Sequence, residues 1–266
     1  LGDVYKRQLI SMLRALQHRG FDSVGVAIFN GENALDGDVF SFFMVTRDII
    51  GSAGKVTGAI ASAGGDIRDI RLMPLSGLSF DRYTVRINRE GIRRLVKAVN
   101  STGISKVLAV GRCIEVYKNV GTVDELDSKF NVSGLKGTHG IGHVRFSTES
   151  EVDLFHAHPF QSLDYPDIAV VENGQVTNYL KVRERLERRG RFFETNNDAE
   201  LIVHFIADAL EEGFSLEEAL KLSVEELDGP FSYIVATQDS IGVVRDKLGL
   251  RPAVVLEGGE LFAVAS

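Results

Sequence analysis

Apolar residues recur at helical spacing in several parts of the chain. Residues 9–19 place their leucine and methionine side chains on one helical stripe, and Gly20 ends the pattern. Amphipathic helices are likewise predicted over Asn178–Arg189, Asp198–Glu211 and Leu216–Leu227. The pattern therefore indicates one helix near the start of the chain and a helical stretch beyond its middle.

Apolar runs of strand length lie on both sides of that helical stretch. Before it, strands are predicted at Ser23–Phe29, Val39–Thr46, Gly142–Phe146 and Ile168–Glu172. After it, strands are predicted at Phe231–Thr237, Ile241–Arg245, Ala253–Glu257 and Leu261–Ala265. Strands, then helices, then strands again predict segregated layers, the α+β class, rather than alternating βαβ units.

The stretch before residue 137 has a weaker pattern. Residues 51–80 are rich in Gly, Ala and Ser, and their periodicity is too slight for any element to be predicted. Beyond them, Tyr83–Asn88, Gly91–Asn100 and Lys106–Gly111 are predicted as strand, helix and strand. We expect this block to form a small α+β insertion.

Both ends of the sequence are unusual. It begins with Leu1 rather than Met, and residues 1–8 (LGDVYKRQ) have neither helical nor strand periodicity. It ends at Ser266, within the last predicted strand. We interpret residues 1–8 as a non-native or disordered leader, and residues 9–266 as one domain truncated at both ends.

The composition narrows the class of protein. Of the 266 residues, 44% are hydrophobic and 25% are charged, which is typical of a globular chain. The net charge of −7 argues against a nucleic-acid surface, and no apolar run reaches the roughly 18 residues of a membrane span. A single Cys excludes an internal disulfide framework and fits a reducing compartment. We therefore expect a cytoplasmic protein with neither a nucleic-acid nor a membrane partner.

Three short segments carry side chains suited to binding and catalysis. Arg145 lies inside an apolar strand, and its planar guanidinium suits a carboxylate held by two hydrogen bonds. Asn173 and Gly174 end another strand, where a side-chain amide beside a Gly N–H offers the two converging donors of an oxyanion hole. Asp198 stands at the start of a helix and could receive an ammonium group.

Each of these segments also has a purely structural interpretation. Arg145 could belong to an ion pair, Asn173-Gly174 to a hairpin turn, and Asp198 to a helix cap. The combination is more informative than any single segment. Sites for a carboxylate, an ammonium group and an oxyanion together fit an α-amino acid with a reactive side-chain carbonyl, such as glutamine.

The histidines offer a metal-binding alternative. His156 and His158 could direct two imidazoles to one face of a strand, with His143 as a third ligand. We favour imidazoles that are hydrogen bonded to backbone near Pro159, and we expect no metal site. The sequence contains no P-loop and no glycine-rich dinucleotide-binding motif, which gives nucleotide cofactors little support.

A series of short motifs runs through the chain. They are LQHRG at 16–20 with Asp22-Ser23, GHVRFST at 142–148, HPF at 158–160, ENG at 172–174 with Asn178-Tyr179, NDAE at 197–200, GPFS at 229–232, and RD at 245–246 with GLRP at 249–252. In this order they resemble the class II glutamine amidotransferase domain, an N-terminal-nucleophile hydrolase. The resemblance covers residues 9–30 and 137–266. The length of 31–136 and the wording GHVRFSTES look most like the amidotransferase part of archaeal-type glutamate synthases, with amidophosphoribosyltransferase as the nearest competitor.

The resemblance implies a fold and a set of roles. The expected fold is a four-layer αββα sandwich, two antiparallel sheets between helical layers, with an α+β insertion at about 47–136. By motif position, Arg145 would hold the α-carboxylate of glutamine, Asp198 its α-ammonium group, and Thr148 would add a hydrogen bond. The Asn173 side chain and the Gly174 N–H would stabilise the oxyanion. In the family, an N-terminal Cys attacks the glutamine amide, ammonia leaves, and the resulting thioester is hydrolysed.

The sequence departs from the family at this nucleophile. The residues LGDVYKRQ stand where the family has Met-Cys-Gly. Cys113 is the only thiol, lies inside the insertion and carries no terminal amine, so we expect it to be a small buried apolar residue. We expect the chain as printed to be inactive without the N-terminal Cys, which a start further upstream would supply.

The expected function is that of a glutaminase domain that delivers ammonia to a synthase partner or domain, with glutamate synthase as the leading interpretation. An amidophosphoribosyltransferase-type domain and a non-catalytic, glutamine-binding regulatory module are the alternatives, and an unrelated structural α+β domain is a third. No cofactor is expected in this domain. A flavin or an iron–sulfur centre would belong to another domain or chain, because this one has no ligands for either.

Overall fold

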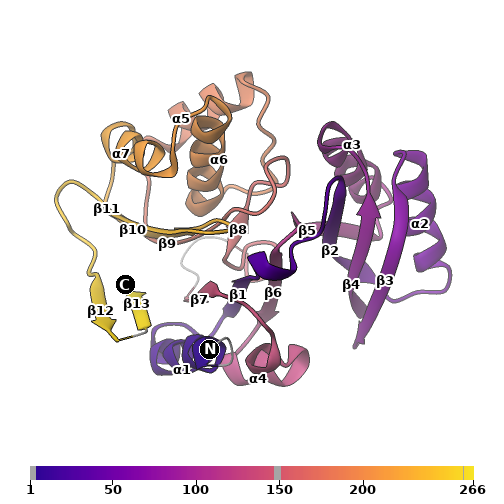
Figure 1. Ribbon diagram of the computed structural model, residues 1–266, viewed down its shortest axis with the longest axis horizontal. Helices are drawn as coiled ribbons and strands as arrows, with labels where there is room; N and C mark the ends of the chain where they lie inside the picture. The colour runs from indigo at the N-terminus through magenta and orange to yellow at the C-terminus, as the bar shows by residue number, and fades with distance from the viewer. Residues whose placement is uncertain (1–3, 147–150, 260) are drawn as a thin grey trace. The chain divides into compact units, whose positions relative to one another are not determined.

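The chain divides into two compact units, each with its own core. The computed structural model describes residues 4–146, 151–259 and 261–266. Unit 1 comprises Leu1–Gly31, Tyr117–Ser162 and Ile168–Ser266, and unit 2 comprises Glu32–Val116 and Leu163–Asp167. The elements of both units are labelled in Figure 1.

Unit 1 is built on two sheets. The first has the strand order β6-β1-β7, with β1 and β7 antiparallel, and the second has the antiparallel order β11-β10-β9-β8. The strands of the first are β1 (Ser23–Phe29), β6 (Ile114–Val120) and β7 (His139–Arg145). Those of the second are β8 (Phe160–Gln161), β9 (Ala169–Gly174), β10 (Phe231–Ala236) and β11 (Ile241–Arg245).

Helices cover the outer faces of these two sheets. Helices α1 (Val4–Leu16) and α4 (Val123–Phe130) pack on the first sheet, and α6 (Asp198–Glu211) and α7 (Leu216–Glu226) pack on the second, with α5 (Tyr179–Arg188) against α6. Strand β7 contacts β9 and β10, so the two sheets face each other. The predicted αββα sandwich of the α+β class is therefore confirmed (Figure 1).

The sequence explains why these elements form. All seven residues of β1 are buried, which suits a strand with a helical layer on one face and a second sheet on the other. Helix α6 is buried along most of its length because it lies between the sheet and its neighbours α5 and α7. Its first turn is capped by Asn197, whose side chain accepts a hydrogen bond from Ala199 N at 2.9 Å.

Shorter elements complete unit 1. They are the 3₁₀ turns Gln17–Arg19 and Val132–Gly134, and a hairpin of β12 (Val254–Gly258) and β13 (Leu261–Ala265). The turn Gly31–Asn33 marks the junction with unit 2. No helix in the described part of the chain is long and apolar enough to cross a membrane.

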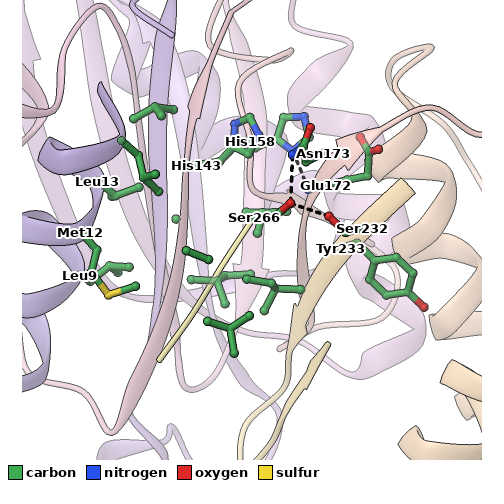
Figure 2. Close-up of a pocket in the computed structure, with 18 of the residues that line it drawn as sticks. Leu9, Met12, Leu13, His143, His158, Glu172, Asn173, Ser232, Tyr233 and Ser266 are labelled. Carbon is green, nitrogen blue, oxygen red and sulfur yellow. Dashed lines mark hydrogen bonds between the residues drawn. The ribbon is translucent and has the colours of Figure 1, made fainter. Parts of the chain in front are cut away.

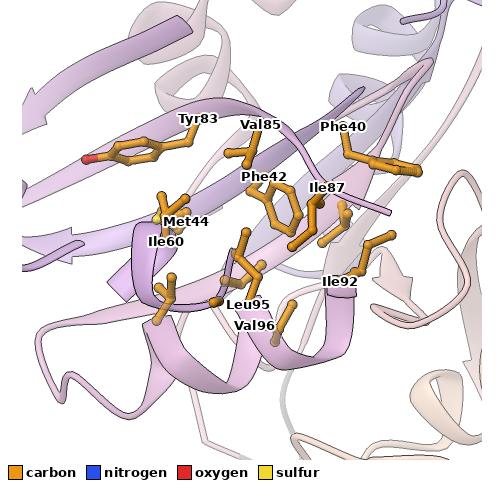
Figure 3. Packing of buried hydrophobic residues seen from close by; sticks show 14 of the residues in the cluster. Phe40, Phe42, Met44, Ile60, Tyr83, Val85, Ile87, Ile92, Leu95 and Val96 are labelled. Atoms are coloured by element: carbon orange, nitrogen blue, oxygen red, sulfur yellow. The ribbon is translucent and has the colours of Figure 1, made fainter. Parts of the chain in front are cut away.

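Unit 2 is a βαββαβ unit with the order of a ferredoxin-like fold. Its elements are β2 (Val39–Arg47), α2 (Ser52–Ser62), β3 (Asp66–Leu75), β4 (Leu78–Arg86), α3 (Arg89–Asn100) and β5 (Ser105–Gly111). The antiparallel sheet has the order β3-β4-β2-β5. Its core is a cluster of apolar side chains from the sheet and both helices, including Phe42, Tyr83, Ile92 and Leu95 (Figure 3).

The structure corrects several predictions of element boundaries. Helix α1 begins at Val4, so the segment 4–8 continues the helix, because it contains no Pro or Gly to stop it. Unit 2 begins at Glu32 and its main segment ends at Val116, instead of running over about 47–136. The reason is that β2 is a central strand of the unit 2 sheet, whereas α4 packs on β1 of unit 1.

Two elements of unit 2 were not predicted at all. Helix α2 and strand β3 occupy the stretch 51–80, for which no element was expected. Only Val56 and Ile60 are buried in α2, so its apolar stripe is very short. Strand β3 is an edge strand with most positions exposed, which removes the alternation that identifies a half-buried strand.

Candidate active site

Unit 1 contains an open cavity of about 1210 Å³. It is lined by α1, β7, β9, β10, β13 and residues 196–198, and Figure 2 shows part of its wall. Arg145, Asn173, Gly174 and Asp198 all line this one cavity, although they are distant in the sequence. Thr148, the remaining predicted site residue, lies outside the described residues, and its role stays a prediction.

Arg145 is the last residue of β7 and is only 6% exposed. Its Nη1 donates to the backbone oxygen of Glu151 at 3.0 Å. Burial lowers the pKa of the guanidinium, and the nearby carboxylates of Asp153 and Asp22 oppose this shift. Arginine nevertheless stays protonated in proteins, so the cavity wall carries a largely desolvated cation suited to a carboxylate.

Asn173 and Gly174 end β9 and do not form a hairpin turn. The chain goes on to α5, and Gly174 pairs with Phe231 of β10. Gly174 has a φ of +147°, and a Cβ atom there would lie 2.1 Å from the backbone oxygen of Pro230, so only glycine fits. The structural alternative of a turn is therefore wrong.

The side-chain amide of Asn173 already donates a hydrogen bond to an oxygen atom. Its Nδ2 donates to Ser266 Oγ at 2.9 Å, and Ser266 Oγ lies 2.6 Å from Ser232 Oγ (Figure 2). Asn173 and Ser232 are opposite each other on adjacent strands, so they share a face of the sheet. The amide thus has the orientation needed to donate to an oxygen on the cavity side.

Asp198 is the first helical residue of α6 rather than its cap, which is Asn197. Its Oδ2 accepts a hydrogen bond from Val176 N at 2.8 Å. Burial raises the pKa of this carboxyl, and the bond from Val176 lowers it. No ion pair of Asp198 is found among the described residues, so the cavity offers an anionic group that a ligand cation could neutralise.

Two histidines lie beside these groups. The rings of His143 and His158 stack with their centroids 4.3 Å apart, and Glu172 N donates to His158 Nδ1 at 3.3 Å. Burial lowers the pKa of His143 to about 4 and that of His158 well below its ordinary value. Both rings are therefore neutral near pH 7, which lets them stack without charge repulsion.

The structure does not assemble the three histidines that the sequence offered as metal ligands. The Nδ1 of His156 lies 2.9 Å from the carboxylate of Asp153. Among the described residues, His156 forms a compact group of potential ligands with Asp153 and Glu151, with their ligand atoms within 4.8 Å of one another. The predicted bonding of these imidazoles to backbone is met only in part: His158 accepts from the backbone N–H of Glu172, whereas His156 bonds to the Asp153 side chain.

Comparison with known proteins identifies the family. The profile of a family described as a glutamine amidotransferase domain matches residues 143–266. A protein of Methanothermobacter thermautotrophicus, whose name describes it as a candidate glutamine amidotransferase, is 46% identical over 260 residues, which is 96% of this chain and 84% of that protein. The chain belongs to the class II glutamine amidotransferase family.

Two further comparisons agree with this assignment. This amidotransferase is 32% identical over 260 residues to the glutamine amidotransferase-like protein GlxB of Rhizobium meliloti, covering 97% of the chain and 83% of that protein. The solved glutamine phosphoribosylpyrophosphate amidotransferase of B. subtilis matches 98% of the chain with a TM-score of 0.60 and 20% identity. The chain spans 39% of that solved protein, so the likeness concerns the fold.

One carboxyl group of the amidotransferase cavity was missed in the sequence analysis. Glu172 is 8% exposed, and its Oε1 has no hydrogen-bond partner among the described residues. Burial, assisted by the charge of Asp198, raises the pKa of Glu172 to about 8. A single carboxylate inside the apolar run Ile168–Glu172 was the available signal, because such a group is seldom buried without a reason.

Cys113 belongs to unit 2 and is buried, as predicted. Its Sγ donates to Asp167 Oδ1 at 3.2 Å, and the same oxygen accepts from the backbone N–H groups of Arg112 and Cys113. Burial and the neighbouring Asp167 carboxylate raise the pKa of the thiol. A buried thiol with a raised pKa is a poor nucleophile.

Proposed function

We propose that this amidotransferase binds L-glutamine in the unit 1 cavity and, with the N-terminal Cys of the family as nucleophile, which the printed sequence lacks, hydrolyses its side-chain amide, so that glutamine and water give glutamate and ammonia. The observation that carries this proposal is the position of Arg145, Asn173, Gly174 and Asp198 on the walls of one cavity. A cation, an anion and a pair of neutral donors are the complement of a zwitterionic amino acid with a polar side-chain carbonyl.

Each group has a proposed role. Arg145 pairs with the α-carboxylate, and Asp198 with the α-ammonium group of the substrate. The Nδ2 of Asn173 and the N–H of Gly174 stabilise the oxyanion that forms when the amide carbon is attacked. The existing hydrogen bond from Asn173 Nδ2 to a hydroxyl oxygen supports this role, because an oxyanion is a stronger acceptor than a hydroxyl.

Cys113 is not the proposed nucleophile. Its thiol is buried in unit 2 and hydrogen bonded to Asp167. The mechanism of the family uses a thiol whose own α-amine acts as the base, and an internal residue has no such amine. The first test of the proposal therefore measures binding, which does not depend on a nucleophile.

We propose that the released ammonia goes to a synthase domain or subunit, with glutamate synthase as the first candidate. This extension rests on the sequence of the motif GHVRFSTES at 142–150 and on the length of the block 31–136. An amidophosphoribosyltransferase-type partner is the second candidate, and it is favoured by the fold likeness to the B. subtilis enzyme. Adding the candidate acceptor proteins in turn and measuring glutamine-dependent amination distinguishes the two.

Calorimetric titration with L-glutamine tests the binding site. Charge-assisted hydrogen bonds contribute about 1.5–3 kcal/mol, so Arg145→Ala and Asp198→Asn should each weaken binding by about 10- to 100-fold. The matched controls are Arg185→Ala and Asp124→Asn, whose side chains form exposed ion pairs in unit 1. Unchanged affinity in both site variants would refute the proposed site.

A further inference from the structure

The loop 189–197 joins α5 to α6 and leads directly to the cavity wall. Asn196, Asn197 and Asp198 all line the cavity, and α6 begins at Asp198. The loop itself has no regular secondary structure to fix its path. The position of the Asp198 carboxylate therefore depends on what holds this loop in place, as well as on α6 and on the hydrogen bond from Val176 N.

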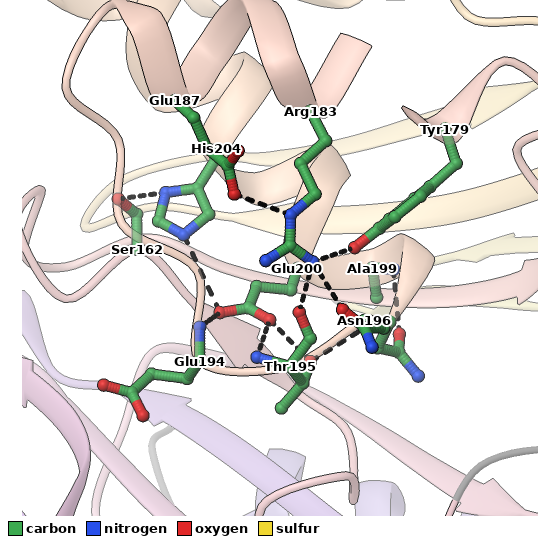
Figure 4. Close-up of polar contacts among 11 residues, drawn as sticks. Ser162, Tyr179, Arg183, Glu187, Glu194, Thr195, Asn196, Ala199, Glu200 and His204 are labelled. Carbon is green, nitrogen blue, oxygen red and sulfur yellow. Dashed lines mark hydrogen bonds and ion pairs between the residues drawn. The ribbon is translucent and has the colours of Figure 1, made fainter. Parts of the chain in front are cut away.

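Glu200 holds the loop from the inside. Its side chain is 3% exposed, and its carboxylate accepts hydrogen bonds from Glu194 N at 2.6 Å, Thr195 N at 2.7 Å and Thr195 Oγ1 at 2.5 Å (Figure 4). Thr195 Oγ1 in turn accepts from Asn197 N at 3.2 Å. The loop backbone is thus bonded to the first turn of the helix that it precedes.

Two further buried side chains extend this network. His204 lies one helical turn beyond Glu200, with its Nε2 3.9 Å from Glu200 Oε1 and its Nδ1 3.2 Å from Ser162 Oγ. The ring of Phe193 packs on the His204 ring, with centroids 4.5 Å apart. Ser162 follows β8, so the network connects the second sheet, α6 and the loop (Figure 4).

Arg183 of α5 holds the same loop from the other side. Its Nη1 donates to Thr195 O at 2.9 Å, to Asn196 Oδ1 at 2.6 Å and to Tyr179 OH at 2.7 Å. The guanidinium also lies over the ring of Phe193, 4.6 Å from its centroid. The Nε of the same guanidinium donates to Glu187 Oε1 at 2.8 Å, so the planar group bonds Glu187 and the loop at once while it lies over Phe193, which a single ammonium nitrogen could not do.

We infer that Glu200 and Arg183 are positioning residues for Asp198, and that they set the preference of the cavity for ligands that carry an α-ammonium group. This inference rests on the proposed binding of glutamine. Neither residue is among the described residues that line the cavity, so their effect on a ligand acts through the loop. The hydroxyl, carboxylate and imidazole of Ser162, Glu200 and His204 are buried, which assigns them to support rather than to contact with substrate.

The test compares two ligands that differ only at the α-carbon. Calorimetry on the full chain measures the affinity for L-glutamine and for 4-carbamoylbutanoate, which is glutamine without its α-amine. Glu200→Gln places an amide N–H opposite one of the loop N–H donors, so one hydrogen bond is lost. Arg183→Lys removes the guanidinium that bonds both Glu187 and the loop. We expect each variant to weaken L-glutamine binding about tenfold and to leave 4-carbamoylbutanoate binding unchanged within about twofold.

Two substitutions serve as matched controls. Glu217→Gln and Arg185→Lys repeat the same chemical changes at ion pairs on α7 and α5 that do not touch the loop. Both controls should leave the ratio of the two affinities as it is in the wild type. If Glu200→Gln or Arg183→Lys weakens both ligands equally, or neither, the positioning role is refuted.

Thermal unfolding of each variant shows whether the variant is folded, so that a loss of binding is not mistaken for a loss of structure. If Glu200→Gln does not fold, Thr195→Val, which removes only the hydroxyl between Glu200 and Asn197, takes its place with the same expected selectivity. A wild-type chain that fails to bind L-glutamine at all refutes the proposed function. A wild type that binds, combined with an unchanged ligand ratio in every loop variant, refutes this inference alone.

Discussion

The two units use their buried space in opposite ways. The interior of unit 2 is a continuous cluster of apolar side chains, in which Phe42, Tyr83 and Leu95 are fully buried. Between its two sheets, unit 1 instead has a cavity of about 1210 Å³ whose wall includes the buried groups of Arg145 and Glu172. Desolvated ionisable groups destabilise a fold, and unit 1 gathers them on the wall of a cavity, whereas the buried Asp81 of unit 2 accepts a hydrogen bond from Ser79.

This difference separates the apolar core residues, which stabilise the fold, from the ionisable cavity residues, which are available to bind a ligand. The conformational requirements of the unit 2 core are satisfied mainly by apolar packing, which is insensitive to pH, although Asp81 is buried in this unit with a raised pKa. Those of unit 1 depend on groups whose pKa values are shifted by burial, such as His143, His158 and Glu172. Perturbed pKa values around one cavity are typical of a functional site.

The largest expected effect is on the packing of unit 2. Phe42→Ala should lower the free energy of unfolding by about 3–5 kcal/mol, because it removes a fully buried ring from the core. Urea denaturation followed by circular dichroism measures this loss. Phe21→Ala, at a ring that is 58% exposed, is the control and should cost far less. An equal loss in both variants would break the contrast between core and surface.

A smaller effect is expected at two glycines with positive φ. Gly174→Ala should cost about 2–3 kcal/mol and weaken glutamine binding, because the new Cβ would lie 2.1 Å from Pro230 O. Gly77 of unit 2 has a φ of +75° with no atom within 4 Å of the Cβ position, so Gly77→Ala should cost only about 1 kcal/mol. Thermal unfolding of both variants compares the two sites, and a larger loss at Gly77 would contradict the steric argument.

A pH-dependent effect is expected from Glu172. Its pKa is about 8 in the folded chain and 4.5 ordinarily, so the folded state binds the extra proton between these values. Titration of this group should therefore lower the free energy of unfolding as the pH rises, by about 1.6 kcal/mol between pH 6.5 and pH 8. Glu172→Gln should abolish this fall.

The comparison with Glu172→Gln separates Glu172 from the buried histidines, which both proteins share. His143 and His158 have lowered pKa values, so the unfolded state binds their protons first and their destabilising effect grows as the pH falls through about 6.5. Urea titrations of the wild type and of Glu172→Gln at several pH values measure the difference. Parallel curves for the two proteins above pH 6.5 would show that Glu172 is not the titrating group.

The smallest effect is expected at Cys113. Its thiol is 5% exposed and its pKa is raised, so it should not react with an alkylating reagent at pH 8 while the chain is folded. Mass spectrometry should detect alkylation only after denaturation. Rapid alkylation of the native protein would contradict the burial of this residue.

Much of the fold follows from local patterns. The continuous apolar run of β1 and the helical period of α6 are strong signals because both elements are covered on more than one side. Helix α2 and strand β3 gave no signal, because one buries few residues and the other is an exposed edge. The assignment of β2 to unit 2 depends on its pairing with β4 and β5, which no local pattern reports.

The candidate site was predicted better than its supports. Arg145 was singled out as a charged side chain inside an apolar strand, and Asn173 and Asp198 as polar side chains at a strand end and a helix start, and they do line one cavity. Glu200 and His204 also lie at helical spacing, but this pair alone is common in helices. Its importance comes from the loop residue Thr195 and from Ser162, whose proximity only the tertiary structure reveals.

Because unit 2 includes the separate short segment Leu163–Asp167, it is difficult to produce as one continuous fragment. Asp167 accepts the N–H groups of Arg112 and Cys113 and the thiol of Cys113, although it stands 54 residues beyond that cysteine. A fragment that contains only residues 32–116 would lack Asp167, so these three donors would lose their shared hydrogen-bond acceptor. Any graft of the ferredoxin-like unit onto another protein must therefore carry a surrogate carboxylate with it.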